Sequence, residues 1–247
     1  DENERALARF STYSATVRYR ASMVNSVGDT AISDYAAFQR RVANYRDQVC
    51  RQIYRENQSC IRVKKEEVAV CRMTAIFEKT LEISNRTGFQ AMSVRDLSEA
   101  TGISMGALYS YIESKERLLD MILGLGSSTT RQVLNEMPQD TLGARAKLRW
   151  FLRTHLYLTE AMQPWFYFSY MESRHFGKEA REKAIDKELA TERLVADYLQ
   201  EGIAEGEFAT DEPELTAAAV KPLLQDWYLK RWKFHRRDIS VDHYADF

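Results

Sequence analysis

The sequence predicts an all-α fold, and three observations lead to this prediction. Only four prolines and ten glycines interrupt the 247 residues. Most long segments repeat apolar residues at intervals of three and four, which is the spacing of one face of an α-helix. Serine, threonine and glycine stand at the ends of several of these segments, where they cap or stop helices. The length suits one large or two small domains with a buried core.

The composition is that of an ordinary globular chain. Apolar residues make up 45% and charged residues 29% of the sequence, and the formal net charge is -1. The longest apolar stretches, such as residues 165–168, are far shorter than the about 20 residues that span a bilayer. We therefore expect no membrane segment. The first residues lack the order of a secretory signal, so a cytoplasmic location is expected.

The three cysteines, Cys50, Cys60 and Cys71, are predicted to be reduced structural thiols. They are odd in number, and the sequence has no C-x-x-C pair or neighbouring histidine that would suggest zinc. A redox switch that uses Cys50 and Cys60 is the alternative, although spacing alone does not bring two Cα atoms within bridging distance. We expect no metal site and no cofactor.

The first quarter of the chain is its basic part, and residues 1–63 are predicted to be a basic helical extension. Residues 1–65 carry 12 lysines and arginines against 7 acidic residues. Residues 33–57 predict an amphipathic helix whose arginines lie mostly off its apolar stripe. This basic face is either the solvated side of a packed helix or a footprint for phosphates. Residues 13–23 fit a strand or a helix, and a helix or an arm is favoured.

The first helix of the next segment has a clear end. Apolar residues at near-helical spacing predict a helix from about Lys65 to Arg86. Gly88 follows it at a position where a left-handed residue commonly ends a helix. Ser93 and Asp96 then have the spacing of a capping box, in which the hydroxyl and the carboxylate satisfy free backbone N–H groups. A short helix is therefore expected from Ser93 onward.

Two short helices separated by a tight turn follow from this pattern. Thr101 and Gly102 stop the first short helix, and Ser104 caps a second that runs through Ile112. Ser114 caps the helix after it. Two short helices joined by a glycine-containing turn of three or four residues form a helix-turn-helix.

This segment resembles the N-terminal DNA-binding domain of the tetracycline-repressor (TetR) family. The matching residues are Gly88-Phe89, Ser93-Val94-Arg95-Asp96-Leu97, Thr101-Gly102-Ile103-Ser104-Met105-Gly106-Ala107-Leu108-Tyr109, Tyr111-Ile112 and Ser114-Lys115-Glu116-Arg117-Leu118. The match covers about residues 65–120. It implies a three-helix DNA-binding domain in residues 64–120 and a larger helical domain for ligand binding and dimerisation in residues 121–247.

The second short helix is predicted to enter the major groove of an operator in double-stranded DNA, with its N-terminal part at the base edges. Ser104 can hydrogen-bond a base or a phosphate, Met105 can make apolar contacts, and Ala107 can touch a thymine methyl group. The resemblance implies that phosphates are held by Ser93, Arg95, Tyr109 and Lys115, with Tyr111 as a further edge or backbone contact.

The sequence departs from the family pattern at two places. Met105 stands where the family often has a basic or polar residue, and Ile112 replaces the usual aromatic residue. Residues 101–112 therefore contain no charged side chain. Because neutralised phosphates supply much of DNA affinity, cations outside this helix must provide it. The arginines of the extension are candidates, while extra dimer contacts and a brace against the DNA-binding domain are the alternative roles of that extension.

Three long helices are expected in the remaining chain. They cover residues 141–162, with a break at Pro164, residues 178–206, and residues 213–235, with a kink at Pro222. The resemblance implies that the last two meet their symmetry mates in a four-helix dimer interface, and packing within one chain is the alternative. A homodimer would place two recognition helices one DNA turn apart.

Aromatic side chains crowd residues 150–171 more densely than one helix face needs. Ordinary core packing is the simpler interpretation. The functional interpretation is the wall of a pocket for a small apolar or aromatic effector, with arginines and histidines as polar anchors. The candidate ligand-binding residues are Trp150, Arg153, His155, Trp165, Phe168, Met171 and Arg174.

Two motifs point weakly to other functions. Residues 102–106 match the G-x-S-x-G nucleophile elbow around Ser104, but a capped helix rather than a strand precedes this serine. Residues 123–128 resemble the start of a dinucleotide loop without its third glycine, and they are expected to form a helix end. No catalytic residue is assigned.

The sequence as a whole favours a transcriptional repressor that a ligand controls. It would act as a homodimer that holds its operator until a small molecule enters the C-terminal domain and changes the spacing of the two DNA-binding heads. A constitutive DNA-binding protein without an effector and a helical enzyme are the alternatives.

Overall fold

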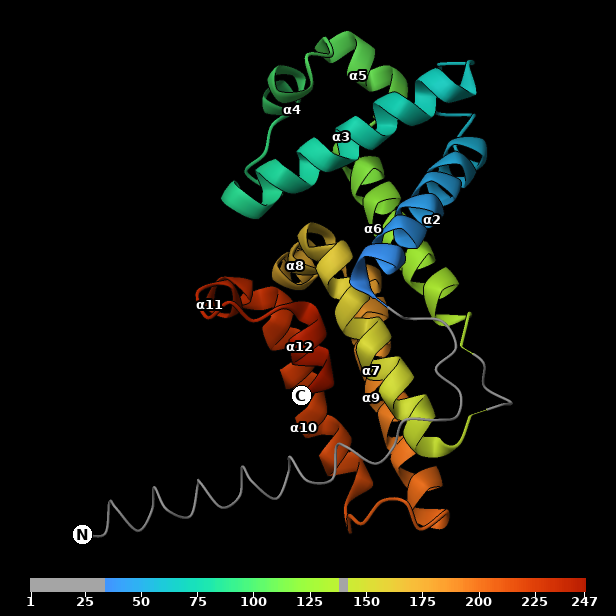
Figure 1. The fold of residues 1–247 in the computed structure, drawn as a ribbon. Helices are drawn as coiled ribbons and strands as arrows, with labels where there is room; N and C mark the ends of the chain where they lie inside the picture. Colours follow the sequence, from blue (N-terminus) through green and yellow to red (C-terminus); the bar gives the residue numbers. More distant parts are fainter. Residues whose placement is uncertain (1–33, 138–141) are drawn as a thin grey trace, which may run out of the picture. The chain divides into compact units, whose positions relative to one another are not determined.

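The computed structural model describes residues 34–137 and 142–247, and this part of the chain is helical with no strand (Figure 1). The all-α prediction is confirmed. Residues 34–247 form one unit, and the ambiguous segment 13–23 lies outside the described residues. None of the described helices is both long and apolar enough to cross a membrane.

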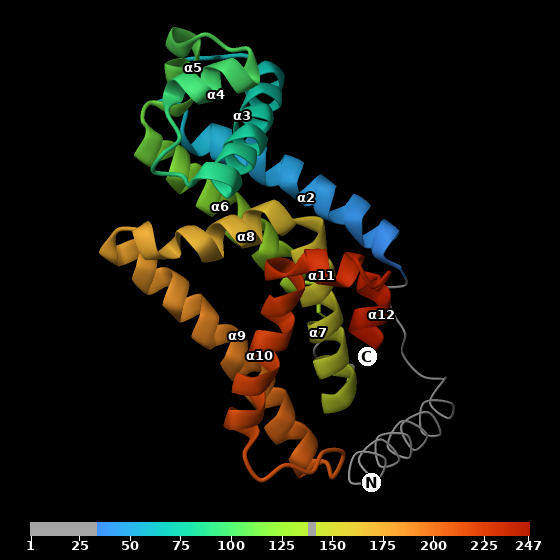
Figure 2. The ribbon, with the colours of Figure 1, turned by 90° about the vertical axis from the view of Figure 1, so that its left-hand side faces the viewer.

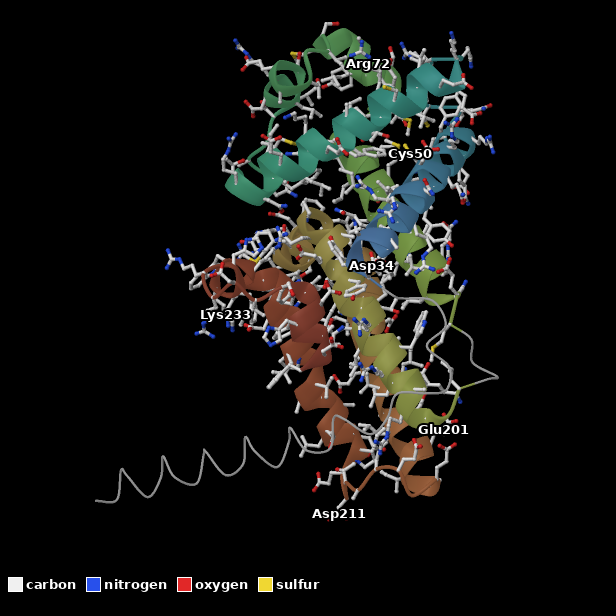
Figure 3. The ribbon with its side chains drawn as sticks, in the orientation of Figure 1. Asp34, Cys50, Arg72, Glu201, Asp211 and Lys233 are labelled. Atoms are coloured by element: carbon white, nitrogen blue, oxygen red, sulfur yellow. The ribbon has the colours of Figure 1, made fainter. Side chains whose placement is uncertain are left out.

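The helix predicted over residues 33–57 is α2, Tyr35–Glu56. It begins at Asp34, whose carboxylate accepts a hydrogen bond of 2.7 Å from the Ala37 backbone N–H. Its apolar side is buried, and it packs against α3, α6 and α7. Cys50, labelled in Figure 3, faces α3, and its sulfur lies 3.9 Å from the Val70 carbonyl oxygen. The apolar stripe of α2 therefore belongs to the core of the unit.

The predicted helix-turn-helix is confirmed. Its two helices are α4, Val94–Thr101, and α5, Met105–Ile112, and the longer helix α3, Glu66–Thr87, precedes them. Gly88 ends α3 with φ 88° and ψ 143°. The positive φ agrees with the prediction, but this ψ lies outside the left-handed helical region, in backbone space that glycine alone adopts readily.

The caps of the two short helices form as the sequence predicts. The Ser93 hydroxyl accepts the Asp96 backbone N–H at 3.1 Å, and the Asp96 carboxylate accepts the Ser93 backbone N–H at 2.8 Å. The hydrogen bonds that the Asp96 carboxylate accepts from the Ser93 backbone N–H and from the Ser93 hydroxyl lower the pKa of Asp96. The Ser104 hydroxyl accepts the Ala107 N–H at 3.3 Å. The orientation of α5 is thus fixed from its first turn.

The turn between α5 and α6 is strained at one residue. Glu113 has φ 54° and ψ -55°, and the Ser114 N–H donates to the Ile112 carbonyl oxygen at 2.5 Å across it. This is the geometry of a γ-turn with positive φ, which is rare for a residue that carries a Cβ atom. Ser114 then caps α6, Lys115–Leu134, as predicted.

The expectation of a helix end at residues 123–128 is wrong. Gly124 and Gly126 lie within α6, which also continues without a break across the predicted domain boundary at 120–121. The reason is tertiary: the indole of Trp165 packs directly on Gly126, where a Cβ atom would overlap the ring. This glycine allows close approach of two helices and does not end one. The boundaries at 63–64 and 120–121 stay predictions.

Two of the expected long helices are observed after α6. They are α7, Ala144–Ala161, and α9, Lys178–Ala204. Between them lie α8, Gln163–Glu172, with Pro164 in its first turn, and a short 3₁₀ helix, η2, Ser173–His175. The predicted break near Pro164 is therefore confirmed.

The helix expected over residues 213–235 is shorter than predicted. It is α10, Pro213–Leu229, which contains Pro222 and is followed by Lys230 as its C-cap residue. Two short helices follow, α11, Arg231–His235, and α12, Val241–Asp246, and the second was not predicted. Figure 2 shows α10 beside α9, with α12 close to α7, and α10 packs on α9 and α12 on α7.

The two glycines of α6 give a matched test of the packing at Trp165. A Cβ atom on Gly126 would overlap the Trp165 ring, whereas one on Gly124 would meet no atom within 4 Å. We expect Gly126→Ala to lower the free energy of unfolding by about 1–3 kcal/mol because the core is overpacked. Gly124→Ala should raise it by about 0.5–1 kcal/mol, since alanine favours helix interiors. Urea denaturation measures both, and equal stabilities would contradict the packing.

Candidate DNA-binding surface and effector region

The outward face of α5 carries mostly small side chains and no charge. Leu108 and Ile112 point into the core. The exposed residues of this helix and its cap are Ser104, Met105, Gly106, Ala107 and Tyr109, of which Met105 is 44% and Tyr109 42% exposed. Small side chains at the N-terminal end of a helix leave room for close approach to base edges, so this face has the shape that major-groove contact requires.

The predicted phosphate contacts divide into exposed and buried residues. Ser93 and Arg95 are exposed at the start of α4, and the Arg95 guanidinium pairs with the exposed Glu99 carboxylate at 3.3 Å. Such a surface pair is weak and can exchange for a phosphate. Tyr111 is only 8% exposed, so its side chain lies inside the domain and is not available to DNA in this conformation.

Lys115 is held at the start of α6. Its ammonium donates to the Gln90 carbonyl oxygen at 2.9 Å and lies 5.0 Å from the centroid of the Phe89 ring. Desolvation lowers the pKa of Lys115. The position of this cation is therefore set by the loop between α3 and α4, next to the first turn of α4.

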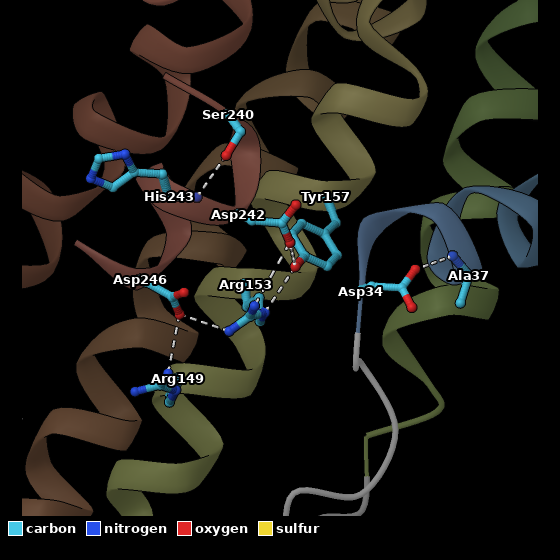
Figure 4. Close-up of polar contacts among 9 residues, drawn as sticks. All are labelled: Asp34, Ala37, Arg149, Arg153, Tyr157, Ser240, Asp242, His243 and Asp246. Atoms are coloured by element: carbon cyan, nitrogen blue, oxygen red, sulfur yellow. Dashed lines mark hydrogen bonds and ion pairs between the residues drawn. The ribbon is translucent and has the colours of Figure 1, made fainter. Parts of the chain in front are cut away.

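The predicted ligand-binding residues are not brought together. Arg153 points toward α12, where its guanidinium donates to Asp246 at 2.8 Å, and it also donates to the hydroxyl of Tyr157 on its own helix at 3.1 Å (Figure 4). Asp242 completes this network by accepting from Tyr157. These contacts tie α7 to the C-terminal helix, so Arg153 has a structural partner.

Two further predicted ligand residues lie where α8 meets the DNA-binding helices. The Trp165 indole N–H donates to the Ile122 carbonyl oxygen of α6 at 2.9 Å. Phe168 meets Phe89 edge to face, with ring centroids 5.8 Å apart. In addition, the Asn85 side-chain amide of α3 donates to the Pro164 carbonyl oxygen at 2.8 Å. This face of α8 is thus a docking surface for α3 and α6.

The remaining members of the predicted set also separate. Trp150 is partly buried against the core cluster around Phe151 and Tyr198. Met171 and Arg174 are exposed, and the Arg174 guanidinium contacts the His175 imidazole at 3.0 Å. Of the seven predicted ligand residues, His155 alone lies among buried polar and aromatic groups between α7, α8 and α10.

The surroundings of His155 form a polar cluster inside an aromatic shell. The imidazole is buried, and its Nδ1 atom has no hydrogen-bond partner among the described residues. Burial, and secondly the positive charge of Lys221, lowers the pKa of His155 to about 3. The Phe166 ring lies 6.3 Å away, centroid to centroid, and Tyr228 lies 5.7 Å beyond Phe166. An unpartnered buried nitrogen beside a buried cation is costly for folding alone.

Lys221 of α10 is the cation of this cluster. It is buried, and its ammonium lies 3.5 Å from the Glu188 carboxylate of α9. The other oxygen of Glu188 accepts the Gln225 amide at 2.6 Å. Burial lowers the pKa of Lys221, and burial raises the pKa of Tyr228. The sequence analysis did not select Lys221, although it is the one charged residue in the apolar stretch 217–224.

The alternative motifs take ordinary structural roles. Ser104 caps α5 and follows the helix α4, so the strand that a nucleophile elbow needs does not precede it. The three cysteines are free, and burial raises the pKa of the Cys50 thiol, which opposes thiolate chemistry. Across residues 34–137 and 142–247, no three His, Cys, Asp or Glu side chains could together hold a metal ion.

The capped helix pair with its exposed neutral face defines a helix-turn-helix DNA-binding regulator. Residues 76–122 match the family model of bacterial regulatory proteins of the tetR family, and residues 141–237 match the tetracyclin repressor-like C-terminal domain. The chain belongs to the tetracycline-repressor family.

Three relatives illustrate the similarity. The transcriptional repressor KstR2 from Rhodococcus jostii is 27% identical over 177 residues, which are 70% of this chain and 85% of that protein. The structure of AibR in complex with isovaleryl coenzyme A and operator DNA matches with a TM-score of 0.59 at 21% identity. The match covers 71% of this chain and 94% of the AibR chain. The structure of FadR from Bacillus subtilis in complex with stearoyl-CoA matches with a TM-score of 0.52 at 19% identity. The match covers 70% of this chain and 93% of the FadR chain.

The buried imidazole should make folding sensitive to mild acid. Because the folded protein holds His155 with a pKa of about 3, only the unfolded chain takes up a proton below about pH 6.5. The free energy of unfolding should therefore fall as the pH decreases, by about 1.4 kcal/mol per unit below that value. Between pH 7 and pH 5, wild-type protein should lose about 2 kcal/mol more than His155→Gln in urea denaturation.

His175→Gln is the matched control because His175 is exposed. It should lose as much stability as the wild-type protein over the same pH range. Equal losses in wild-type protein and His155→Gln would show that the imidazole is hydrated in the folded state and would contradict its burial.

Proposed function

We propose that this protein is a transcriptional repressor that binds its operator as a homodimer and is released by a small-molecule effector. The DNA-binding part of this proposal is carried by one observation: the first turn of α5 exposes uncharged side chains, while the inner face of the helix is buried. The proposed partner is bacterial DNA, so the proposal includes a cytoplasmic location. It also assigns regulation and not catalysis, since Ser104 serves as a helix cap.

The proposed DNA contacts follow from exposure. Ser104, Met105 and Ala107 face the bases, where a hydroxyl, a thioether and a methyl group read hydrogen-bonding edges and thymine methyl groups. The proposed phosphate contacts are Ser93, Arg95, Tyr109 and Lys115. Tyr111 is left out of this set because it is buried.

The proposed base contacts are too weak for one copy of the chain, so the proposal includes a dimer. None of the base-facing side chains is a bidentate reader, so one α5 alone would bind weakly. Apolar side chains are exposed on the two helices that the family resemblance assigns to dimerisation. They are Ile185 and Leu189 of α9 and Leu215 and Leu223 of α10. We propose that a second copy of the chain covers them.

We place the effector at the cluster of His155 and Lys221. A ligand with an apolar body and an anionic or carbonyl oxygen would fit it, because the oxygen can accept from the ammonium and the aromatic rings can contact the body. The structures of AibR with isovaleryl coenzyme A and of FadR with stearoyl-CoA make acyl-CoA thioesters the first class to test.

α8 is the proposed link between effector and DNA. Phe166 contacts His155 and Tyr228, whereas Trp165, the residue before it, packs on α6. Neighbouring residues on a helix point about 100° apart, so one helix meets the effector cluster and the DNA-binding helices at once. A ligand that shifts Phe166 must also move Trp165, and the coupling is reciprocal in free energy.

The DNA-binding half is tested at Ala107. Repeated gel-retardation selection from a random duplex library supplies the operator probe, and fluorescence anisotropy measures its affinity. Ala107→Glu places a carboxylate on the exposed face of α5 and should weaken binding at least about 100-fold through repulsion by phosphates. The control, Ala146→Glu, makes the same change at an exposed position of α7 and should bind like the wild-type protein. Equal affinities of the two variants would overturn the assigned surface.

The effector half is tested with stearoyl-CoA and isovaleryl-CoA. Either ligand should release the wild-type protein from the selected duplex. Lys221→Met keeps the volume of the side chain but removes its charge. It should lower the affinity for the releasing ligand at least about tenfold, while the affinity for DNA stays unchanged. Lys230→Met removes an exposed cation just beyond α10 and should respond like wild type. Release that is equally efficient in Lys221→Met would remove this lysine from the effector site.

A further inference from the structure

The recognition helix brings no positive charge to DNA. Residues 101–112 contain no charged side chain, yet the salt-dependent part of DNA affinity comes from cations that replace counterions at phosphates. If the protein binds DNA as proposed above, cations close to α5 must supply this part.

The arginines of α2 are largely occupied within the chain. Four of its five arginines have carboxylate partners, which lie on α2 itself, on α3 or just after α6. The four pairs are Arg41–Glu136 at 3.2 Å, Arg46–Glu78 at 3.4 Å, Arg51–Asp47 at 2.9 Å and Arg55–Glu66 at 2.8 Å. The basic face of α2 is therefore engaged within the chain, and its ion pairs must open before these arginines can contact phosphates.

The segment between α2 and α3 has a different character. Arg62, Lys64 and Lys65 are all exposed. Within the described residues, no carboxylate lies at ion-pair distance from any of the three. The segment therefore presents three exposed cations just before Glu66 and Glu67 of α3.

Hydrogen bonds hold this segment against the recognition helix. The Arg62 backbone N–H donates to the Ser110 carbonyl oxygen at 2.9 Å, which satisfies one of the free carbonyls in the last turn of α5. The buried Tyr54 side chain holds the other side, because its hydroxyl lies 3.0 Å from the carbonyl oxygens of both Val63 and Lys64. Ile61 is buried beneath the segment.

The backbone that carries the three cations is therefore held beside α5 before DNA arrives. Figures 1 and 2 show that α4, α5 and the start of α3 lie at the same end of the described unit. A cation held beside a helix that lies in the major groove is in reach of the sugar-phosphate strand that borders the groove.

We propose that Arg62, Lys64 and Lys65 form a phosphate-binding segment that contacts the DNA backbone next to the groove occupied by α5. The segment supplies affinity that does not depend on sequence, while the neutral face of α5 supplies the base contacts. This inference rests on the proposed DNA binding and adds to it the residues that carry its salt dependence.

The test compares two triple variants on the selected duplex at several salt concentrations. Arg62→Gln, Lys64→Gln and Lys65→Gln together should reduce the slope of log affinity against log salt by about 0.9 for each phosphate that is no longer neutralised. Three such phosphates per subunit, or six in the proposed homodimer, would change the slope by about 5.4 and lower the affinity at 0.1 M salt by several orders of magnitude. The ratio of affinities for the selected and a scrambled duplex should change by less than about twofold, since phosphates carry no sequence information.

The control triple variant is Lys230→Gln, Arg236→Gln and Arg237→Gln. It removes the same charge from exposed positions at the end of α10 and beyond α11 and should keep the wild-type slope. If both triple variants keep the wild-type slope, the inference about the phosphate-binding segment is wrong, while the proposed function stands. If the wild-type protein retards no duplex, both this inference and the proposed function are wrong. Urea denaturation of each variant distinguishes weaker DNA binding from incomplete folding.

Discussion

The contact between Trp165 and Gly126 is the constraint on which the arrangement of the described unit depends. The indole occupies the space that any larger residue at position 126 would fill, and its N–H bonds to the α6 backbone at Ile122. α6 begins beside the recognition helix and continues into the C-terminal helices. A close-packed contact of this kind has few intermediate states, so a displacement of α8 is transmitted to α6.

Helix α2 of the N-terminal extension makes a second connection within the described unit. α2 packs against α3 and α6, and also against α7 through the rings of Tyr35 and Phe38 on Tyr157. Its arginine pairs reach α3 through Glu66. The extension therefore links DNA-binding helices to α7, which carries His155 of the proposed effector site.

The sequence predicted the features that depend on local chemistry and missed those that depend on distant partners. Caps at Ser93 and Ser104 were predictable because a hydroxyl bonds to backbone within three residues. The role of Gly126 was not, because the ring that fills its space comes from 39 residues further along the chain. For the same reason the sequence does not reveal that Trp165 bonds to the α6 backbone or that Lys221 is buried, since both depend on other helices.

The cluster around His155 and Lys221 lowers the stability of the folded protein, and the proposed effector binding gives a reason for its presence. A buried nitrogen without a partner costs about 1–3 kcal/mol, and a well-packed apolar side chain there would be more stable. The chain nevertheless buries an imidazole and an ammonium together inside an aromatic shell. A ligand oxygen that accepts a hydrogen bond from Nδ1 would satisfy this unpartnered atom, so binding would recover free energy that folding leaves unused. This recovered free energy is what a ligand needs to stabilise one position of α8 over another.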